Sequence, residues 1–167
     1  MTKSQLKVLD KVTREAKEAQ LVNDACGWST LYGLSQHFHF IPKELVAAAT
    51  SLSGGCGASN GSCGAYVCGL LAIGWKFNPP MGDDSPEGLA KREIAGKKLK
   101  KFREAFIKEF GTTMCPVIHA QLYGRSFDLM DEGQREEFFS IPDHREKCAS
   151  VVTKGARLAA EIMLEEA

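Results

Sequence analysis

The apolar residues of this 167-residue sequence recur with helical spacing almost from end to end. In residues 4–22 the apolar positions repeat every three or four residues, which places them on one face of a helix: Leu6, Leu9, Val12, Ala16 and Ala19. No segment of similar length alternates polar and apolar residues, as a half-buried strand would. The sequence therefore predicts an all-α fold.

Helix start and stop signals divide the chain into six to eight helices joined by short loops. Asp24 is a candidate N-cap for a helix that reaches residue 37, and Ser85 with Pro86 is a strong start for a long helix that Gly111 ends. The other expected helices cover residues 4–22, 42–52, 63–76, 115–123, 135–139 and 142–165. We expect a compact helical bundle, with residues 1–167 forming a single domain.

Residues 54–75, GGCGASNGSCGAYVCGLLAIGW, combine three of the six cysteines with seven of the sixteen glycines. The first nine of these residues are too rich in glycine to form a stable helix or strand, so a glycine-rich cysteine loop is expected there. Cys63 then lies where this loop enters an apolar helix. Because free N–H groups and the positive end of the helix dipole favour a thiolate, we expect a lowered pKa for Cys63. The alternative is a glycine-packed turn whose cysteines are small buried hydrophobes.

The charge balance excludes several classes of partner. Lysine plus arginine equals aspartate plus glutamate at 21 each, which argues against a protein that mainly binds nucleic acid or an anionic membrane. A basic run in the long helix is interpreted as a solvated face: Lys97, Lys98, Lys100, Lys101 and Arg103. The longest apolar run, residues 65–75, is about half a membrane span, and residues 1–11 do not resemble a secretory signal. A cytoplasmic protein without nucleic-acid or membrane partners is expected.

Six cysteines in a chain without an export signal favour metal ligands or redox thiols over structural disulfides. Four of them fall in the first or second turn of different predicted helices: Cys26, Cys63, Cys115 and Cys148. If these helix starts meet at one end of the bundle, four thiols and several positive dipole ends gather there, which suits a cluster of net negative charge. Cys56 in the loop and Cys68 are possible additional ligands, although a regular helix points Cys63 and Cys68 in different directions.

Two histidines allow a zinc alternative. Cys115 and His119 are four residues apart, as are His144 and Cys148, so each pair shares one helix face and together they could form a Cys2His2 site. Other templates are absent from the sequence: it contains no phosphate-binding loop, no dinucleotide fingerprint and no CxxCH haem motif.

The ordered cysteines resemble a family of redox-active proteins named for the pattern C…GCAxxG…C…C, also written with CGAxxG. The matching pieces are NDACGWSTLYGL around Cys26, SCGA around Cys63, FGTTMC ending at Cys115, and KCASVVTKGARLAAEIM around Cys148. The resemblance spans roughly residues 20–166. It departs from the pattern at position 68, which is Cys instead of Gly. Cys56 is additional, and residues 125–140 are longer than expected. The resemblance implies a redox function but no particular reaction.

Three functional readings follow. In the first, the four cysteines bind an iron–sulfur cluster for electron transfer or redox sensing, and backbone N–H groups of the glycine loop bind its sulfurs: those of Gly55, Gly57, Gly61 and Gly64. In the second, the protein is a thiol–disulfide oxidoreductase with Cys63 as the attacking thiolate and Cys68 or Cys56 resolving. In the third, zinc or no metal at all supports a structural module. Either redox reading requires an unidentified redox partner protein, and the amphipathic helices permit a homodimer.

Overall fold

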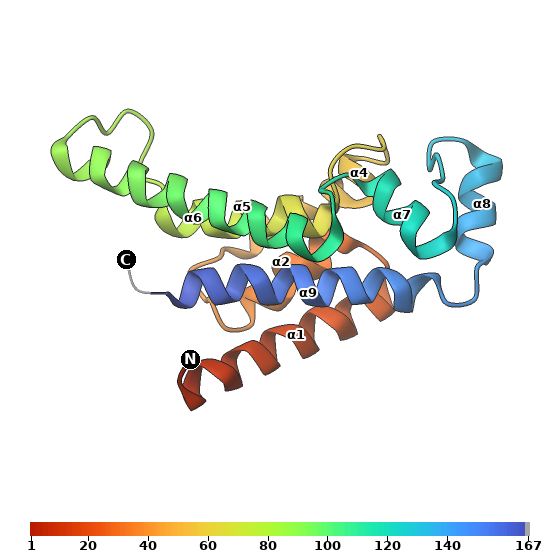
Figure 1. The fold of residues 1–167 in the computed structure, drawn as a ribbon, viewed down its shortest axis with the longest axis horizontal. Helices are drawn as coiled ribbons and strands as arrows, with labels where there is room; N and C mark the ends of the chain where they lie inside the picture. Colours follow the sequence, from red (N-terminus) through yellow and green to blue (C-terminus); the bar gives the residue numbers. More distant parts are fainter. Residues whose placement is uncertain (166–167) are drawn as a thin grey trace.

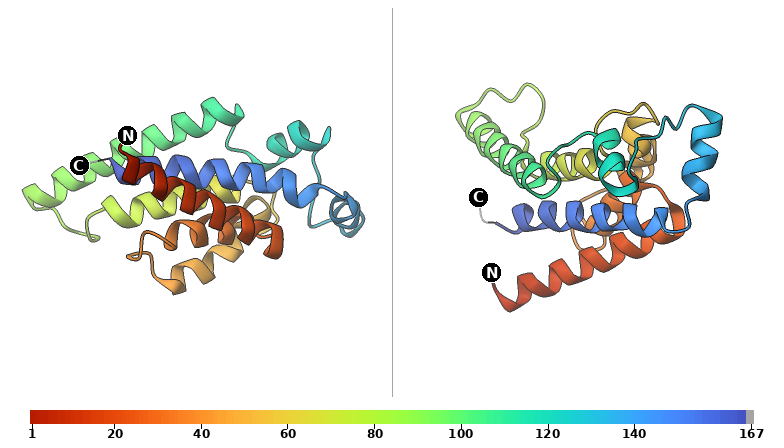
Figure 2. Two further views of the ribbon diagram at one scale, coloured as in Figure 1. Left: turned by 90° about the horizontal axis from the view of Figure 1, so that it is seen from below. Right: turned by 45° about the vertical axis from the view of Figure 1, so that its right-hand side comes forward.

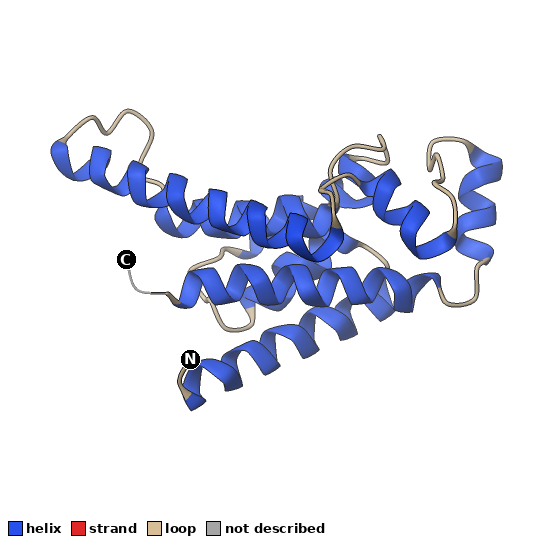
Figure 3. Cartoon of the chain, viewed as in Figure 1, coloured by secondary structure: helices blue, strands red, loops and turns tan. Residues whose placement is uncertain are grey.

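The computed structural model of the chain describes residues 1–165, and that part consists of helices and loops, with one isolated antiparallel bridge between Ser62 and Met114 (Figure 3). The helices are α1 (Lys3–Asn23), α2 (Cys26–Ser35), α3 (Lys43–Ala48), the 3-10 helix η1 (Ala49–Leu52), α4 (Ser53–Cys56), α5 (Gly64–Phe77), α6 (Pro86–Phe110), α7 (Cys115–Tyr123), α8 (Glu132–Ser140) and α9 (His144–Leu164). The all-α prediction is confirmed. α4 is a single distorted turn, because Gly54 and Gly55 within it have positive φ.

The long helices form the body of the bundle. α9 packs against α1, α5, α2 and α6, and α1 also packs against α2 (Figures 1 and 2). α5 lies between α2, α6 and α9, so its apolar face is covered from three directions. Among residues 1–165, no helix combines the length and the apolar character that crossing a membrane requires.

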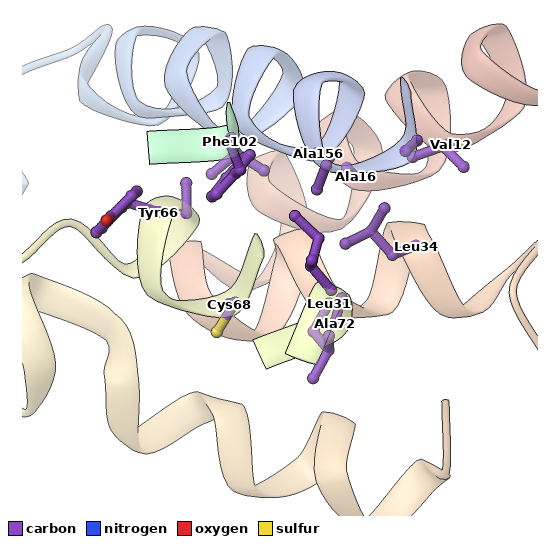
Figure 4. Packing of buried hydrophobic residues seen from close by; sticks show 14 of the residues in the cluster. Val12, Ala16, Leu31, Leu34, Tyr66, Cys68, Ala72, Phe102 and Ala156 are labelled. Carbon is purple, nitrogen blue, oxygen red and sulfur yellow. The ribbon is translucent and has the colours of Figure 1, made fainter. Parts of the chain in front are cut away.

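The core of this body is apolar and closely packed. Phe102 of α6, Tyr66 of α5, Leu31 of α2 and Ala156 of α9 belong to one cluster of buried side chains, which Figure 4 shows from close by. The rings of Tyr66 and Phe102 stack with centroids 5.7 Å apart. Burial of this apolar surface is the main force that holds the helices together.

Small residues let the helices approach closely. A Cβ atom added to Gly33 of α2 would lie 2.5 Å from the Cβ of Ala16 in α1, and one added to Gly69 of α5 would lie 2.3 Å from the ring of Phe102. Such distances are far shorter than a van der Waals contact. Glycine is therefore required at these two helix crossings.

Most of the predicted boundaries agree with the structure. The Ser85 hydroxyl accepts a hydrogen bond from the Gly88 N–H at 3.1 Å at the start of α6, and Gly111 ends this helix in the left-handed conformation. The prediction that Asp24 caps α2 is wrong. Asp24 ends α1 with φ of 51°, and its carboxylate binds distant side chains instead of the first turn of α2.

The basic run of α6 is not entirely a solvated face. Lys98 is only 9% exposed, and its Nζ lies 3.4 Å from Oε2 of Glu165 and 5.2 Å from the ring centre of Phe77. A long aliphatic stem allows a lysine to pack on apolar surface while its charge stays paired. The prediction of exposure is therefore wrong at this one position.

One end of the bundle is built mainly from shorter elements, and we call it the cysteine pole. It comprises α4, α7, α8, the loop 57–63, the C-terminal end of α1 with Asp24, and the N-terminal ends of α2, α5 and α9. Figure 1 shows α4, α7 and α8 together at this end, on the right, with α8 at its outer edge. α8 is longer than the predicted turn at residues 135–139, because the Asp131 carboxylate accepts the Gln134 N–H at 2.8 Å and starts the helix earlier.

Candidate redox centre

Four cysteines from four helices line one small cavity at the cysteine pole. Cys26 is the first residue of α2, Cys63 precedes α5, Cys115 is the first residue of α7, and Cys148 lies in the second turn of α9. The cavity has a volume of about 30 Å³, and its other lining residues are Ile118, His119, Leu122 and Val151. All six cysteines of the chain are free thiols. The structure thus brings together the four thiols that the helix starts singled out.

The glycine-rich loop fixes two of these cysteines through backbone hydrogen bonds. The N–H of Cys63 donates to the carbonyl of Thr113 at 2.7 Å, and the N–H of Cys115 donates to the carbonyl of Gly61 at 2.9 Å. Gly61 in turn donates to the carbonyl of Gly55 at 2.9 Å. Residues distant in sequence are therefore held side by side before any side chain is considered.

Backbone N–H groups surround the sulfur of Cys26. Burial raises the pKa of the Cys26 thiol, and hydrogen bonds from the N–H groups of Gly54 and Gly64 and from the Ser53 hydroxyl oppose that rise. A Cβ atom on Gly64 would lie 2.6 Å from this sulfur, so only glycine permits the contact. Gly64 is among the glycines that the sequence analysis selected, whereas Gly54 was not.

The other selected glycines have structural tasks in the loop. Gly55 has φ of 78°, and a Cβ there would lie 3.1 Å from the Cβ of Cys115. Gly57, with φ of 72°, ends α4 and donates its N–H to the carbonyl of Ser53 at 3.1 Å. Gly61 pairs with Gly55 and Cys115 as described above. These three glycines shape the loop, while the N–H groups of Gly64, Gly54 and Gly27 act on the sulfur of Cys26.

Burial has a larger effect on the pKa of these thiols than the helix N-termini have. Burial raises the pKa of Cys63 well above its ordinary value, and the nearby Cys26 and Cys115 add to the rise, whereas the N–H groups of Ala65 and Tyr66 oppose it. Burial likewise raises the pKa of Cys115 and that of Cys148 to about 12. The expectation of a lowered pKa for Cys63 is therefore wrong, because loss of water outweighs the helix N-terminus. Without a metal these thiols stay protonated at neutral pH.

His119 lies beside Cys115 and is mostly buried. Its Nε2 is 3.6 Å from the sulfur of Cys115, and its ring stacks on Phe138 with centroids 5.0 Å apart. Burial lowers the pKa of His119, which keeps the ring neutral. Its Nδ1 is buried and has no hydrogen-bond partner within residues 1–165. A neutral imidazole with a free nitrogen is a competent metal ligand or hydrogen-bonding group.

Two further contacts at the cysteine pole could not be read from the sequence. The Tyr123 hydroxyl lies 3.1 Å from the sulfur of Cys148 and donates to the carbonyl of His144 at 2.9 Å. His144 Nε2 lies 2.8 Å from the Asp24 carboxylate, and its Nδ1 lies 2.8 Å from the carbonyl of Ile141. No local spacing links Asp24 to His144, or Tyr123 to Cys148, so only the tertiary fold reveals these pairs.

The Cys2His2 arrangement does not form. His144 uses both ring nitrogens for Asp24 and Ile141, so neither is free for a metal in this conformation. Within residues 1–165, no three His, Cys, Asp or Glu side chains stand in a geometry preset to hold a metal ion.

Cys56 and Cys68 lie next to the cavity but do not line it. Cys68 is fully buried in α5, and its sulfur would lie 3.3 Å from a Cβ on Gly27. Cys56 has φ of 64°, and its thiol hydrogen-bonds the carbonyl of Ser62 at 3.5 Å. Burial is the main cause that raises the pKa of Cys68, and the thiols of Cys26 and Cys56 raise it further. Both cysteines are therefore near neighbours of the four, in a second layer.

The fold and the site define an all-α, cysteine-rich protein that gathers free thiols from four helices into one cavity. Comparison with known proteins agrees: residues 25–162 match the family described as "Putative redox-active protein (C_GCAxxG_C_C)". The chain belongs to this family, and this membership supports a redox role. No curated protein and no solved structure matches the chain significantly.

Proposed function

We propose that this protein binds an iron–sulfur cluster through Cys26, Cys63, Cys115 and Cys148 and uses it for electron transfer or redox sensing. The observation that supports this proposal is the convergence of four thiols from four separate helices on one cavity. A thiol–disulfide enzyme needs two cysteines, whereas four thiolates are the usual ligand set of such a cluster.

The surroundings of the thiols fit a negatively charged group. Hydrogen bonds from the Gly54 and Gly64 N–H groups reach the sulfur of Cys26, and those of Ala65 and Tyr66 reach the sulfur of Cys63. Hydrogen bonds to ligand sulfurs stabilise a reduced cluster and tune its potential. Metal binding would also displace the protons that burial holds on the thiols, since a coordinating thiol is deprotonated.

The size of the cavity defines what binding would require. A volume of about 30 Å³ is roughly the share of one water molecule in the liquid. Thiol side chains would therefore rotate as a cluster binds, and the room for this lies in an adjoining cavity of about 300 Å³. That cavity shares Cys26, Cys115, Cys148 and His119 with the small one. Cys63 lines only the small cavity and not the adjoining one, so it would remain the innermost ligand.

The thiol–disulfide reading has less support. Cys63 is 6% exposed, and burial raises its pKa, so the attacking thiolate would be scarce at neutral pH. Cys68 lies behind Gly27 and lines neither cavity.

The test is anaerobic reconstitution of the reduced protein with ferrous iron and sulfide, followed by iron and acid-labile sulfide analysis, visible absorbance and electron paramagnetic resonance. We expect a brown protein with stoichiometric iron and sulfide. Cys115→Ser should lose most of the bound iron. Cys68→Ala is the matched control, because Cys68 is equally buried but lines neither cavity. A protein that is purified with zinc in place of iron, or one that stays colourless after reconstitution and whose thiols pair on mild oxidation, would contradict the proposal.

A further inference from the structure

The adjoining cavity of about 300 Å³ has features of a site for a small organic molecule. It lies between the four-cysteine cavity and the segment that contains α8, and three of the four proposed ligands form part of its wall. Its volume is at the lower end of ligand pockets in proteins, which suits a molecule of about ten to fifteen non-hydrogen atoms. We call it the α8 chamber.

One side of the α8 chamber is apolar and partly aromatic. Leu129 and Met130 of the loop before α8, together with Phe138 and Phe139 of α8, line this side. Phe138 is 4% exposed and stacks on the ring of His119 with centroids 5.0 Å apart, so no ligand can lie between these two rings. Phe139 is 49% exposed, and its ring favours a flat, unsaturated ligand that packs on it.

The inner end of the chamber offers an unused hydrogen-bond acceptor. Gln20 lines the chamber and is 1% exposed. Its Nε2 donates to Asp24 at 2.9 Å, which fixes the orientation of the amide, and its Oε1 has no hydrogen-bond partner within residues 1–165. Buried polar atoms are rarely left unpaired in native proteins. The free Oε1 therefore suits a ligand that carries a hydroxyl or amine donor.

The mouth of the chamber offers an unused positive charge. Arg135 of α8 lines the chamber and is exposed, and its guanidinium forms no ion pair or hydrogen bond within residues 1–165. The other charged group at the wall, the Asp24 carboxylate, is occupied by Gln20, His144 and Arg145. Arg135 is thus the free charge, and a guanidinium favours a carboxylate, which it can bind in bidentate fashion.

We propose that the α8 chamber binds a small aromatic carboxylic acid with a hydrogen-bond donor at its far end. The carboxylate binds Arg135 at the mouth, the ring packs against Phe139 on the apolar side of the chamber, and the donor reaches Oε1 of Gln20. In the metal-free protein the ligand then lies against Cys26, Cys115 and Cys148, so the ligand and a bound cluster would compete for this space. This binding does not rest on the proposed function, because it involves no metal.

The probe is 4-hydroxybenzoate, titrated by calorimetry or by NMR into the reduced, metal-free protein. We expect saturable binding at up to millimolar concentrations. Removing the charge or the hydroxyl of the probe should weaken its binding. The uncharged methyl 4-hydroxybenzoate and the hydroxyl-free benzoate should therefore each bind several-fold more weakly than 4-hydroxybenzoate. These comparisons need no protein variant and stay valid even if a substitution at buried Gln20 disturbs folding.

Arg135→Gln should weaken the binding of 4-hydroxybenzoate about tenfold and leave the affinity for the methyl ester unchanged. Arg125→Gln is the matched control, because Arg125 is also exposed but pairs with Glu137 and does not line the chamber. An absence of binding to the unmodified protein, or equal loss in both arginine variants, would overturn the proposal. Failure of cluster reconstitution would not affect these measurements, so the two proposals fail separately.

Discussion

The body of the bundle and the cysteine pole differ in how their residues satisfy ordinary folding rules. In the body, Phe102, Phe106 and Leu9 are fully buried among apolar neighbours on regular helices. At the pole lie all four non-glycine residues with positive φ in residues 1–165: Asp24, Cys56, Ala58 and Asn60. Four buried side-chain atoms lack partners within the same residues: Gln20 Oε1, His119 Nδ1, Ser29 Oγ and Thr153 Oγ1. The positive-φ residues therefore set the pole apart, whereas unpartnered polar atoms occur in both regions.

This contrast suggests a division of tasks. The body fixes where the helices begin, and so brings the four cysteines to one end. The pole keeps a strained loop and protonated thiols, together with the unpartnered Oε1 of Gln20 and Nδ1 of His119. Changes at the pole should therefore alter the protein in ways that equivalent changes in the body do not.

The largest expected difference is in the response to alkaline pH. Burial raises the pKa of Cys115 and of Cys148 to about 12, whereas an unfolded thiol titrates near 8.5 to 9. Between these values the unfolded state binds fewer protons than the folded state, so stability falls as pH rises. Each thiol should remove about 1.4 kcal/mol of unfolding free energy for each pH unit above its unfolded pKa.

Urea unfolding of the reduced, metal-free protein between pH 8 and pH 10 measures this slope. Cys148→Ser should reduce the slope by the share of one thiol, since serine does not titrate in this range. A stability that stays constant from pH 8 to pH 10, or a slope unchanged by the substitution, would show that the pole does not hold its thiols protonated.

The second difference concerns glycines. A Cβ on Gly64 would lie 2.6 Å from the sulfur of Cys26 and 2.8 Å from the carbonyl oxygen of Leu52, so Gly64→Ala should cost about 1–3 kcal/mol. Gly96 lies inside α6 with no atom within 4 Å of an added Cβ, so Gly96→Ala should stabilise by about 0.5–1 kcal/mol. Unfolding free energies of both variants test the comparison, which fails if Gly64→Ala is tolerated as well as Gly96→Ala.

The body of the bundle could be predicted from the sequence better than the cysteine pole. Periodicity and capping place the body correctly, because the start of α6 at Ser85 and its end at Gly111 depend on neighbouring residues. The positions of four cysteines at helix starts also follow from local signals. Their convergence on one cavity was conditional on these helix starts meeting at one end of the bundle, which the tertiary fold decides.

The remaining features depend on tertiary packing. The direction of the shift in the Cys63 pKa was predicted wrongly, because the burial of this thiol depends on the helices packed around it. Asp24 looks like a helix cap in the sequence, yet in the fold it pairs with His144, 120 residues away. Free polar atoms such as Oε1 of Gln20 become visible only once all other partners are placed.

The smallest expected difference concerns two tyrosine hydroxyls. The Tyr123 hydroxyl donates to the carbonyl of His144 and contacts the sulfur of Cys148, so Tyr123→Phe should cost about 0.5–1.5 kcal/mol. The matched control is Tyr32→Phe, because the Tyr32 ring stacks on Trp28 while its hydroxyl forms no hydrogen bond within residues 1–165. Urea unfolding of both variants at pH 7 is the measurement. If the two substitutions cost the same, the hydroxyl at the pole adds nothing beyond its ring, and the hydrogen bonds that join α7 to α9 do not stabilise the site.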